Sequence, residues 1–178
     1  NPCCNTTKMG APVEVWVSNL PILFLAALTL AMLVVIFYDT REFIIPNVLV
    51  IAIAMLYLPG FYFLGLNPIN GLTTGGIVLV LGMGLFALKV MGGGDIKLLA
   101  ALALWTGWSS ATINFLIYMA VFGGLFAVAV LILRKIAIFL PVNLPRILRA
   151  GEPIPYGVAI ALAFIMVLWD GQIFKFAL

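Results

Sequence analysis

The stretch LPILFLAALTLAMLVVIFY, Leu20 to Tyr38, runs for 19 residues without a charged side chain. A helix needs about 20 mostly apolar residues to cross the hydrocarbon core of a bilayer, so this stretch predicts a membrane-spanning helix. The whole chain has the same character, because 65% of its 178 residues are hydrophobic and only 8% are charged. A soluble domain averages about 25% charged residues. The composition therefore predicts an all-α, polytopic membrane protein with no soluble domain.

Five further apolar segments bring the expected number of transmembrane helices to about six. The fourth of the six is short, because the 13 steps from Asp95 to Trp108 give a helix of about 20 Å against a hydrocarbon core of about 30 Å. We expect two short crossings here and not a re-entrant loop, since the surrounding sequence is almost entirely apolar. The five segments are Ile44–Leu64, Asn70–Leu88, two within Ile96–Leu133 that divide near Gly107–Ser110, and Tyr156–Phe176.

The basic residues predict how the chain is oriented in the membrane. With six spans, seven of the nine Lys and Arg residues fall on one side, and cytoplasmic loops carry the excess of such residues. We therefore expect both termini outside, with the basic side in the cytoplasm and its longest loop, about residues 134–155, beside anionic lipids. The four tryptophans are expected to anchor the outer interface. The seven basic residues are Arg41, Lys89, Lys97, Arg134, Lys135, Arg146 and Arg149, and the tryptophans are Trp16, Trp105, Trp108 and Trp169.

Residues 20–178 are expected to form one membrane-embedded domain, preceded by an extracytoplasmic segment of residues 1–19. The first residue is Asn and not Met, which favours processing or tagging of the N-terminus. The chain has no histidine, and its two cysteines, Cys3 and Cys4, are adjacent and do not form a C-x-x-C motif. We therefore predict no metal site and no cofactor. A net charge of +3 gives no reason to expect nucleic-acid binding.

Two acids, Asp39 and Asp95, fall at the same expected membrane boundary although they lie 56 residues apart. Asp95 precedes an apolar segment and fits a helix N-cap, and Asp39 fits a solvated loop residue balanced by Arg41. The functional interpretation joins them, because two nearby carboxylates do not both ionise easily and hold one proton between them. The ionised member then activates a water while the protonated member donates to a scissile carbonyl.

Other hydrolytic groups are missing from that boundary. The serines, Ser18, Ser109 and Ser110, are expected on the opposite side, and the chain has no histidine to serve as a base. Gly92, Gly93 and Gly94, immediately before Asp95, are expected to adopt backbone angles closed to other residues and to let a substrate backbone approach. The alternative is a plain flexible connector. Lys97, like Lys89, fits either a substrate contact or an ordinary marker of the cytoplasmic side.

Three motifs around these acids resemble the type IV prepilin peptidase family, the G-x-G-D membrane aspartyl proteases. Gly92–Asp95 matches G-x-G-D, the segment YDTREFIIPN (Tyr38–Asn47) matches the family's first-aspartate segment, and PYGVAIALA (Pro155–Ala163) resembles its last-helix motif. Within the family, the chain is most similar to the short branch that processes Flp/Tad-type pilins. The resemblance covers about Leu20 to Phe176.

The resemblance implies an aspartic-type endopeptidase of the inner (cytoplasmic) membrane in type IV pilus biogenesis. Such enzymes cut prepilins after a glycine that ends a short basic leader, at the cytoplasmic face, and the product enters the pilus assembly machinery. Asp39 and Asp95 carry over as the catalytic pair, and membrane lipids surround the enzyme. The long branch of the family has a cysteine-rich zinc insert and methylates the new N-terminus. This chain has no such insert, so we expect no N-methyltransferase activity.

Three alternatives stay open at this point. An archaeal preflagellin peptidase of the same family shares the motifs. A presenilin-like protease also uses G-x-G-D, but here Pro155-Tyr156-Gly157 replaces the Pro-Ala-Leu motif of that family. A small transporter in which Asp39 and Asp95 bind a proton or cation belongs to another class, although such proteins usually carry internal repeats and sites near the bilayer midplane.

Overall fold

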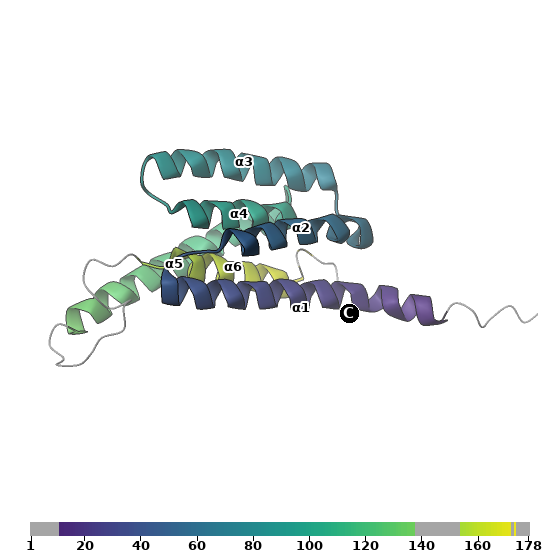
Figure 1. Ribbon diagram of the computed structural model, residues 1–178, viewed down its shortest axis with the longest axis horizontal. Coiled ribbons are helices and arrows are strands. Elements are labelled where there is room, and N and C mark those ends of the chain that lie inside the picture. Colours follow the sequence, from purple (N-terminus) through teal and green to yellow (C-terminus); the bar gives the residue numbers. More distant parts are fainter. Residues whose placement is uncertain (1–10, 138–153, 172, 174–178) are drawn as a thin grey trace, which may run out of the picture.

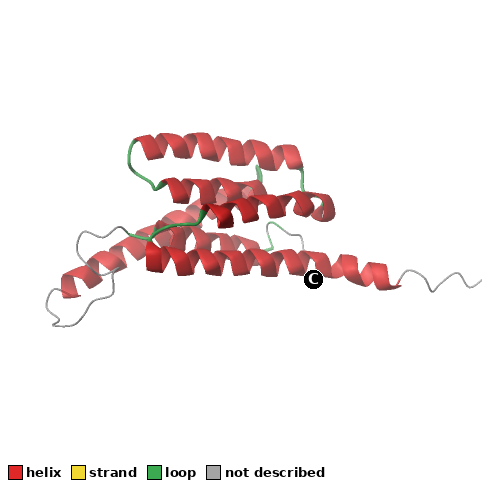
Figure 2. Ribbon diagram, viewed as in Figure 1, coloured by secondary structure: helices red, strands yellow, loops and turns green. Residues whose placement is uncertain are grey.

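The computed structural model describes residues 11–137, 154–171 and 173. The chain runs back and forth along one axis as successive helices (Figure 1). Every regular element in these ranges is helical, which confirms the predicted all-α class (Figure 2). The helices are α1 Ala11–Glu42, α2 Asn47–Leu64, α3 Pro68–Ala87, α4 Gly93–Thr106, α5 Ser110–Ala137 and α6 Tyr156–Trp169.

The predicted helix ends differ from the observed ones by at most four residues, except at the start of α1 and the end of α6. α1 already begins at Ala11, so the expected boundary between residues 19 and 20 falls within this helix. α6 ends at Trp169 and not at Phe176, because Gly171 adopts a left-handed φ of 68°, a conformation that commonly stops a helix. The predicted loop at about 134–155 begins later than expected, since α5 continues to Ala137, and its residues 138–153 lie outside the described part of the chain.

Two short helices form the interior of the bundle. α4 and α6 have 14 residues each, which gives a length of about 21 Å. α4 packs against α3, α2 and α6, while α6 packs against α5, α1 and α4. Leu102 of α4 and Phe164 of α6 are completely buried. The short helices are therefore surrounded mainly by protein, although a helix of this length does not span a bilayer alone.

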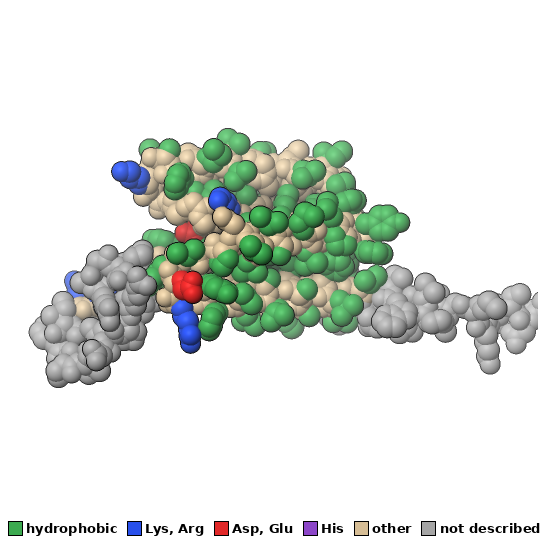
Figure 3. Space-filling view, in the orientation of Figure 1, with side chains coloured by type: hydrophobic (Ala, Val, Ile, Leu, Met, Phe, Trp, Pro, Cys, Tyr) green, Lys and Arg blue, Asp and Glu red, His purple; other side chains and the backbone are tan. Residues whose placement is uncertain are grey.

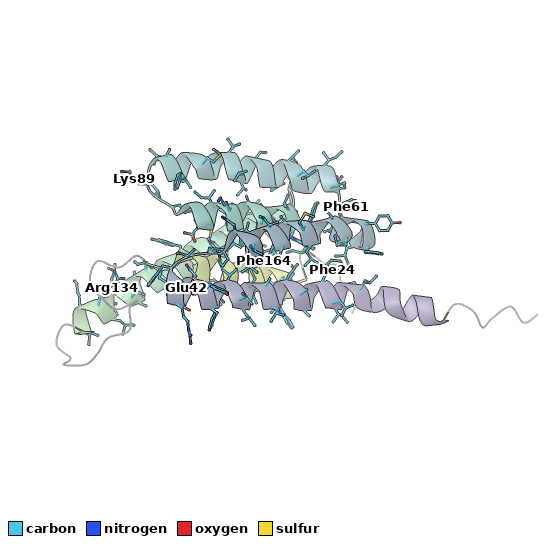
Figure 4. The ribbon with its side chains drawn as sticks, viewed as in Figure 1. Phe24, Glu42, Phe61, Lys89, Arg134 and Phe164 are labelled. Carbon is cyan, nitrogen blue, oxygen red and sulfur yellow. The ribbon has the colours of Figure 1, made fainter. Side chains whose placement is uncertain are left out.

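The four longer helices enclose this interior and present apolar side chains outward. α1 over Leu20–Glu42, α2, α3 and α5 over Ser110–Ile136 are long and apolar enough to cross a membrane. The space-filling view shows hydrophobic side chains over the visible flank of the bundle, with acidic and basic side chains gathered toward one end (Figure 3). Glu42, Lys89 and Arg134 lie at that end (Figure 4). A broad apolar flank with charges at the end is the surface that a bilayer requires, and the chain is a membrane protein.

Trp105 does not anchor a membrane interface, so this part of the prediction is wrong. Its side chain is 2% exposed and packs against the rings of Phe24 and Tyr57 at centroid distances of 6.0 and 5.6 Å. Its indole N–H donates to the backbone carbonyl of Ile53 at 3.2 Å. The side chain is internal because α4 is enclosed by its neighbours, which sequence hydropathy does not reveal. Trp108, at 70% exposed, is at the surface as expected.

Glycines let α3 lie very close to α4. A Cβ atom added at Gly75 would lie 2.8 Å from Leu104 Cδ2, and one at Gly82 would lie 2.5 Å from Ile96 Cγ2. At Gly71 the added atom would lie 2.6 Å from the backbone oxygen of Leu104, which has no freedom to move away. Small residues at helix–helix contacts are typical of membrane proteins, where close backbone approach supplies much of the association energy.

We expect Gly71→Ala to lower the free energy of unfolding by about 2 kcal/mol, because the new methyl group overpacks the contacts of α3 with Tyr57 on α2 and with the Leu104 backbone on α4. Thermal unfolding in detergent measures the effect. Gly76→Ala is the matched control on the same helix, since a Cβ at Gly76 meets nothing within 4 Å. Alanine favours helix more than glycine does, so the control should be neutral or stabilising. Equal stability of the two variants would contradict the close packing at Gly71.

Candidate active site

A cavity of about 880 Å³ opens at the charged end of the bundle. All six of the predicted site residues line it, although they come from two distant parts of the sequence. The other lining residues belong to the end of α1, the start of α2, the end of α3 and the start of α6. The predicted residues are Asp39, Gly92, Gly93, Gly94, Asp95 and Lys97, and the others are Phe43, Ile44, Ile45, Asn47, Phe86, Ala87, Lys89, Val90, Met91, Ile154, Pro155 and Tyr156.

Asp39 is buried in the last turns of α1 and is not a solvated loop residue. Its side chain is 4% exposed, and its Oδ2 accepts a hydrogen bond of 3.0 Å from the backbone N–H of Val158. Val158 lies in the first turn of α6, where backbone N–H groups have no partner within the helix. The C-terminus of α1 disfavours a negative charge, but the N-terminus of α6 favours it. α6 therefore supplies the stabilisation that α1 cannot.

Asp95 lies in the first turn of α4 and is partly buried. The N-cap of this helix is Gly92, so Asp95 is its third residue and not the N-cap that the sequence suggested. The carboxylate nevertheless accepts a hydrogen bond from the backbone N–H of Gly92, as acids in a first turn often do. Asp95 is thus held by the N-terminus of its own helix.

The two carboxylates therefore meet where two short helices begin. Asp39 and Asp95 line the same cavity and are near enough to repel each other electrostatically. Each accepts a backbone N–H from a helix N-terminus, Asp39 from α6 and Asp95 from α4. Two interacting acids release their protons in two steps that belong to the pair. The arrangement can hold one ionised and one protonated carboxyl group side by side.

The three glycines before Asp95 do not adopt left-handed backbone angles, and at Gly92 the lack of a side chain leaves room for the Asp95 carboxylate. Among the described residues the glycines with positive φ are Gly65, Gly107 and Gly171, so the predicted use of special angles at residues 92–94 is wrong. Gly92 has an extended conformation with φ −70° and ψ 145°, which any residue can adopt. A Cβ added there would lie 2.9 Å from Asp95 Oδ2. At this position a side chain would crowd the carboxylate.

Lys97 contacts another polar residue of the cavity wall. Its Nζ donates to Asn47 Oδ1 at 3.1 Å, which joins α4 to the start of α2. Asn47 was quoted in a sequence motif but was not predicted as a site residue, and its place in the cavity wall and its contact with Lys97 identify it. The two interpretations of Lys97, a substrate contact or a marker of membrane orientation, both stay predictions.

Two residues in the wall have left-handed backbone conformations that the sequence did not signal. Phe43 follows α1 with φ 54°, and Lys89 follows α3 with φ 57°. At Lys89 the chain forms a Schellman turn, in which Val90 N–H donates to Leu85 O and Lys89 N–H donates to Phe86 O. Glycine usually occupies this position, and other residues adopt it at a cost of about 1–2 kcal/mol. Both residues line the cavity that holds the two carboxylates.

Metal ligands do not gather in the described ranges. Within residues 11–137, 154–171 and 173, no group of three or more His, Cys, Asp or Glu side chains is placed to hold an ion. A site without metal stays a prediction from the residue types.

The fold and the site define a class, a helical membrane protein in which two carboxylates share a cavity at one end of the bundle. The family described as type IV leader peptidases matches residues 24–128. This match covers more than half of the chain. The protein belongs to the type IV leader peptidase family, which confirms the resemblance seen in its motifs, whereas the Flp/Tad branch stays a prediction.

Two relatives show how far the similarity extends. The chain is 32% identical to the prepilin leader peptidase/N-methyltransferase of Pseudomonas aeruginosa over 156 aligned residues. The aligned region covers 82% of this chain and 49% of that protein. It is 35% identical to the protein of the same name from Aeromonas salmonicida over 89 aligned residues. That aligned region covers 49% of this chain and 26% of that protein. The chain spans about half or less of the length of these curated relatives. No solved structure matches it.

We expect Lys89→Gly to raise the free energy of unfolding by about 1 kcal/mol, because glycine adopts the left-handed conformation without a steric penalty. The midpoint of thermal unfolding in detergent reports the change. Leu88→Gly is the matched control at the neighbouring position, where φ is −78° and glycine relieves nothing. The control should be neutral or destabilising. A destabilised Lys89→Gly variant would show that the residue is not strained.

Proposed function

We propose that this protein is an aspartyl endopeptidase that removes the leader peptide of prepilins of the Flp/Tad type. The observation that carries the proposal is the meeting of Asp39 and Asp95 in one cavity, with both carboxylates held at helix N-termini. Membership of the leader peptidase family supports the same reaction class. The chain offers no histidine for another hydrolytic mechanism.

The two carboxyl groups divide the chemistry between them. The ionised carboxylate takes a proton from a water molecule as its oxygen attacks the scissile carbonyl carbon, and the protonated carboxyl donates its proton to the carbonyl oxygen. The product is a tetrahedral diol, and the two acids have exchanged protonation states. The protonated acid then donates its proton to the amide nitrogen while the ionised acid takes a proton from one diol hydroxyl, and the C–N bond breaks to release a carboxylic acid and an amine. The pair ends ready for another cycle without a covalent intermediate.

The position of the two helix starts supports access of water to this reaction. α4 and α6 both begin at the cavity, which is at one end of the bundle. The opening at the charged end admits water and an extended peptide. We propose that the glycine run at residues 92–94 lies along the substrate backbone, since side chains there are absent. Lys97 stands on the same wall and is available to a carboxylate of the substrate.

The cavity is proposed to face the cytoplasm from the inner membrane, with both termini on the other side. The gathering of basic residues such as Lys89 and Arg134 at the cavity end supports this orientation. We assign the peptidase activity to residues 20–178, with membrane lipids around the long helices and the prepilin as substrate. The mature pilin would then pass to the assembly machinery.

We expect Asp39→Asn and Asp95→Asn each to reduce the rate of prepilin cleavage by at least about 1,000-fold, because each removes one of the two proton-transfer groups. Purified protein in detergent or liposomes, with a prepilin precursor and gel analysis, provides the measurement. Asp170→Asn is the matched control, since Asp170 follows the opposite end of α6. The control should cleave at the wild-type rate. Cleavage retained by either of the first two variants would overturn the paired mechanism.

We expect the product of cleavage to carry an unmethylated N-terminus when this protein acts alone with S-adenosylmethionine present. The relatives carry both activities in their names, but this chain has no C-x-x-C pairs like those of the long branch. Mass spectrometry of the mature pilin distinguishes the two products. The P. aeruginosa relative serves as the positive control. A methylated product from this protein alone would refute the expectation.

A further inference from the structure

The start of α6 is placed to hold Asp39. The backbone N–H of Val158 donates to Asp39 Oδ2 at 3.0 Å, and the N–H of Gly157 also donates to this carboxylate. α6 has Pro155 as its N-cap residue, and no side-chain hydrogen bond caps the helix there. Asp39, which lies more than 110 residues earlier in the chain, supplies the capping hydrogen bond instead. The bond therefore fixes α1 to α6 at the carboxylate itself.

Only glycine fits at residue 157 while this bond is made. A Cβ atom added to Gly157 would lie 2.7 Å from Asp39 Oδ2 and 2.9 Å from Asp39 Cγ. Real Cβ atoms essentially never come within 3.0 Å of such neighbours, so either the carboxylate or the first turn of α6 has to move. Movement of the carboxylate away from α6 would break its hydrogen bond with the Val158 N–H. The missing side chain at residue 157 is thus a condition for the observed position of the carboxylate.

We propose that Gly157 is a positioning residue for the peptidase reaction, because its lack of a side chain lets the first turn of α6 fix the Asp39 carboxylate opposite Asp95. Gly157 has no group that takes part in proton transfer. It acts through the orientation of Asp39, and this inference rests on the proposed aspartyl mechanism. A misplacement of about 1 Å at a reacting group costs about 100-fold in rate, so the reaction is sensitive to this contact.

Two variants test the role from different directions. Gly157→Ala adds one carbon against the carboxylate and should lower kcat for prepilin cleavage by about 100-fold. Val158→Pro removes the donating N–H without adding an atom to residue 157. That N–H has no partner within the helix, so proline in this first turn costs little helix stability. The proline Cδ also takes the place of the amide hydrogen and faces Asp39 Oδ2, so we expect kcat to fall by about 100-fold here too.

Gly123→Ala is the matched control. Gly123 lies on α5 and faces the same helix, but a Cβ there would lie 3.8 Å from Ala159 Cβ, which is an ordinary contact. This variant should keep wild-type kcat. In the Gly157 and Val158 variants we expect KM to stay within about threefold, because substrate binding does not need the exact orientation of Asp39. A merely structural defect would reduce the amount of folded enzyme and leave kcat per folded molecule unchanged.

A double variant separates Asp39 from the other neighbour of Gly157. The added Cβ would also lie 3.0 Å from Ile45 Cδ1, and Ile45→Val removes that atom. The proposal expects Gly157→Ala to remain impaired when combined with Ile45→Val, relative to Ile45→Val alone. Recovery in the double variant would assign the effect to packing against Ile45 and overturn the proposal, as would wild-type kcat in both Gly157→Ala and Val158→Pro. If wild-type protein cleaves no prepilin, the proposed function fails and not this inference alone.

Discussion

A buried and a partly buried carboxylate in a membrane protein have to be compensated, and the architecture depends on how this is done. An ionised acid inside a low-dielectric bundle is costly unless hydrogen-bond donors surround it. Among the described residues, the backbone at two helix N-termini donates hydrogen bonds to Asp39 and Asp95, and Lys89 and Lys97 line the same cavity. α4 and α6 begin at the acids, and their first-turn N–H groups point to them. The bundle is built so that these two helix starts coincide.

The short inner helices make that arrangement compatible with a bilayer. Four long apolar helices cover most of the lipid-facing surface, so α4 and α6 do not need to span the hydrocarbon core. Glycines, which have no side chain, let the outer helix α3 lie close to α4, as Gly71 does against the backbone of Leu104. The result is a cavity that opens at one end of the bundle among the long apolar helices.

The parts predicted from the sequence depend on local composition. Length and hydropathy were enough to place the spans, and the short distance from Asp95 to Trp108 predicted the short α4. The pairing of Asp39 with Asp95 followed from the predicted topology, because the helix ends that carry these two acids fall on the same side of the membrane. Both acids line one cavity. The parts that were missed depend on distant contacts. Neither the burial of Trp105 nor the Val158 bond to Asp39 has a signal in the neighbouring residues.

The central claim is that Asp39 and Asp95 share one cavity in the membrane, and chemical cross-linking measures this most directly. Asp39→Cys and Asp95→Cys are combined in a chain whose Cys3 and Cys4 are replaced by Ser, and membranes are treated with a short bifunctional thiol reagent. Asp39→Cys with Asp170→Cys is the control pair, because Asp170 follows the opposite end of α6. The structure predicts an intramolecular cross-link in the first pair and none in the control. A first pair that fails to cross-link while both thiols react singly would contradict it.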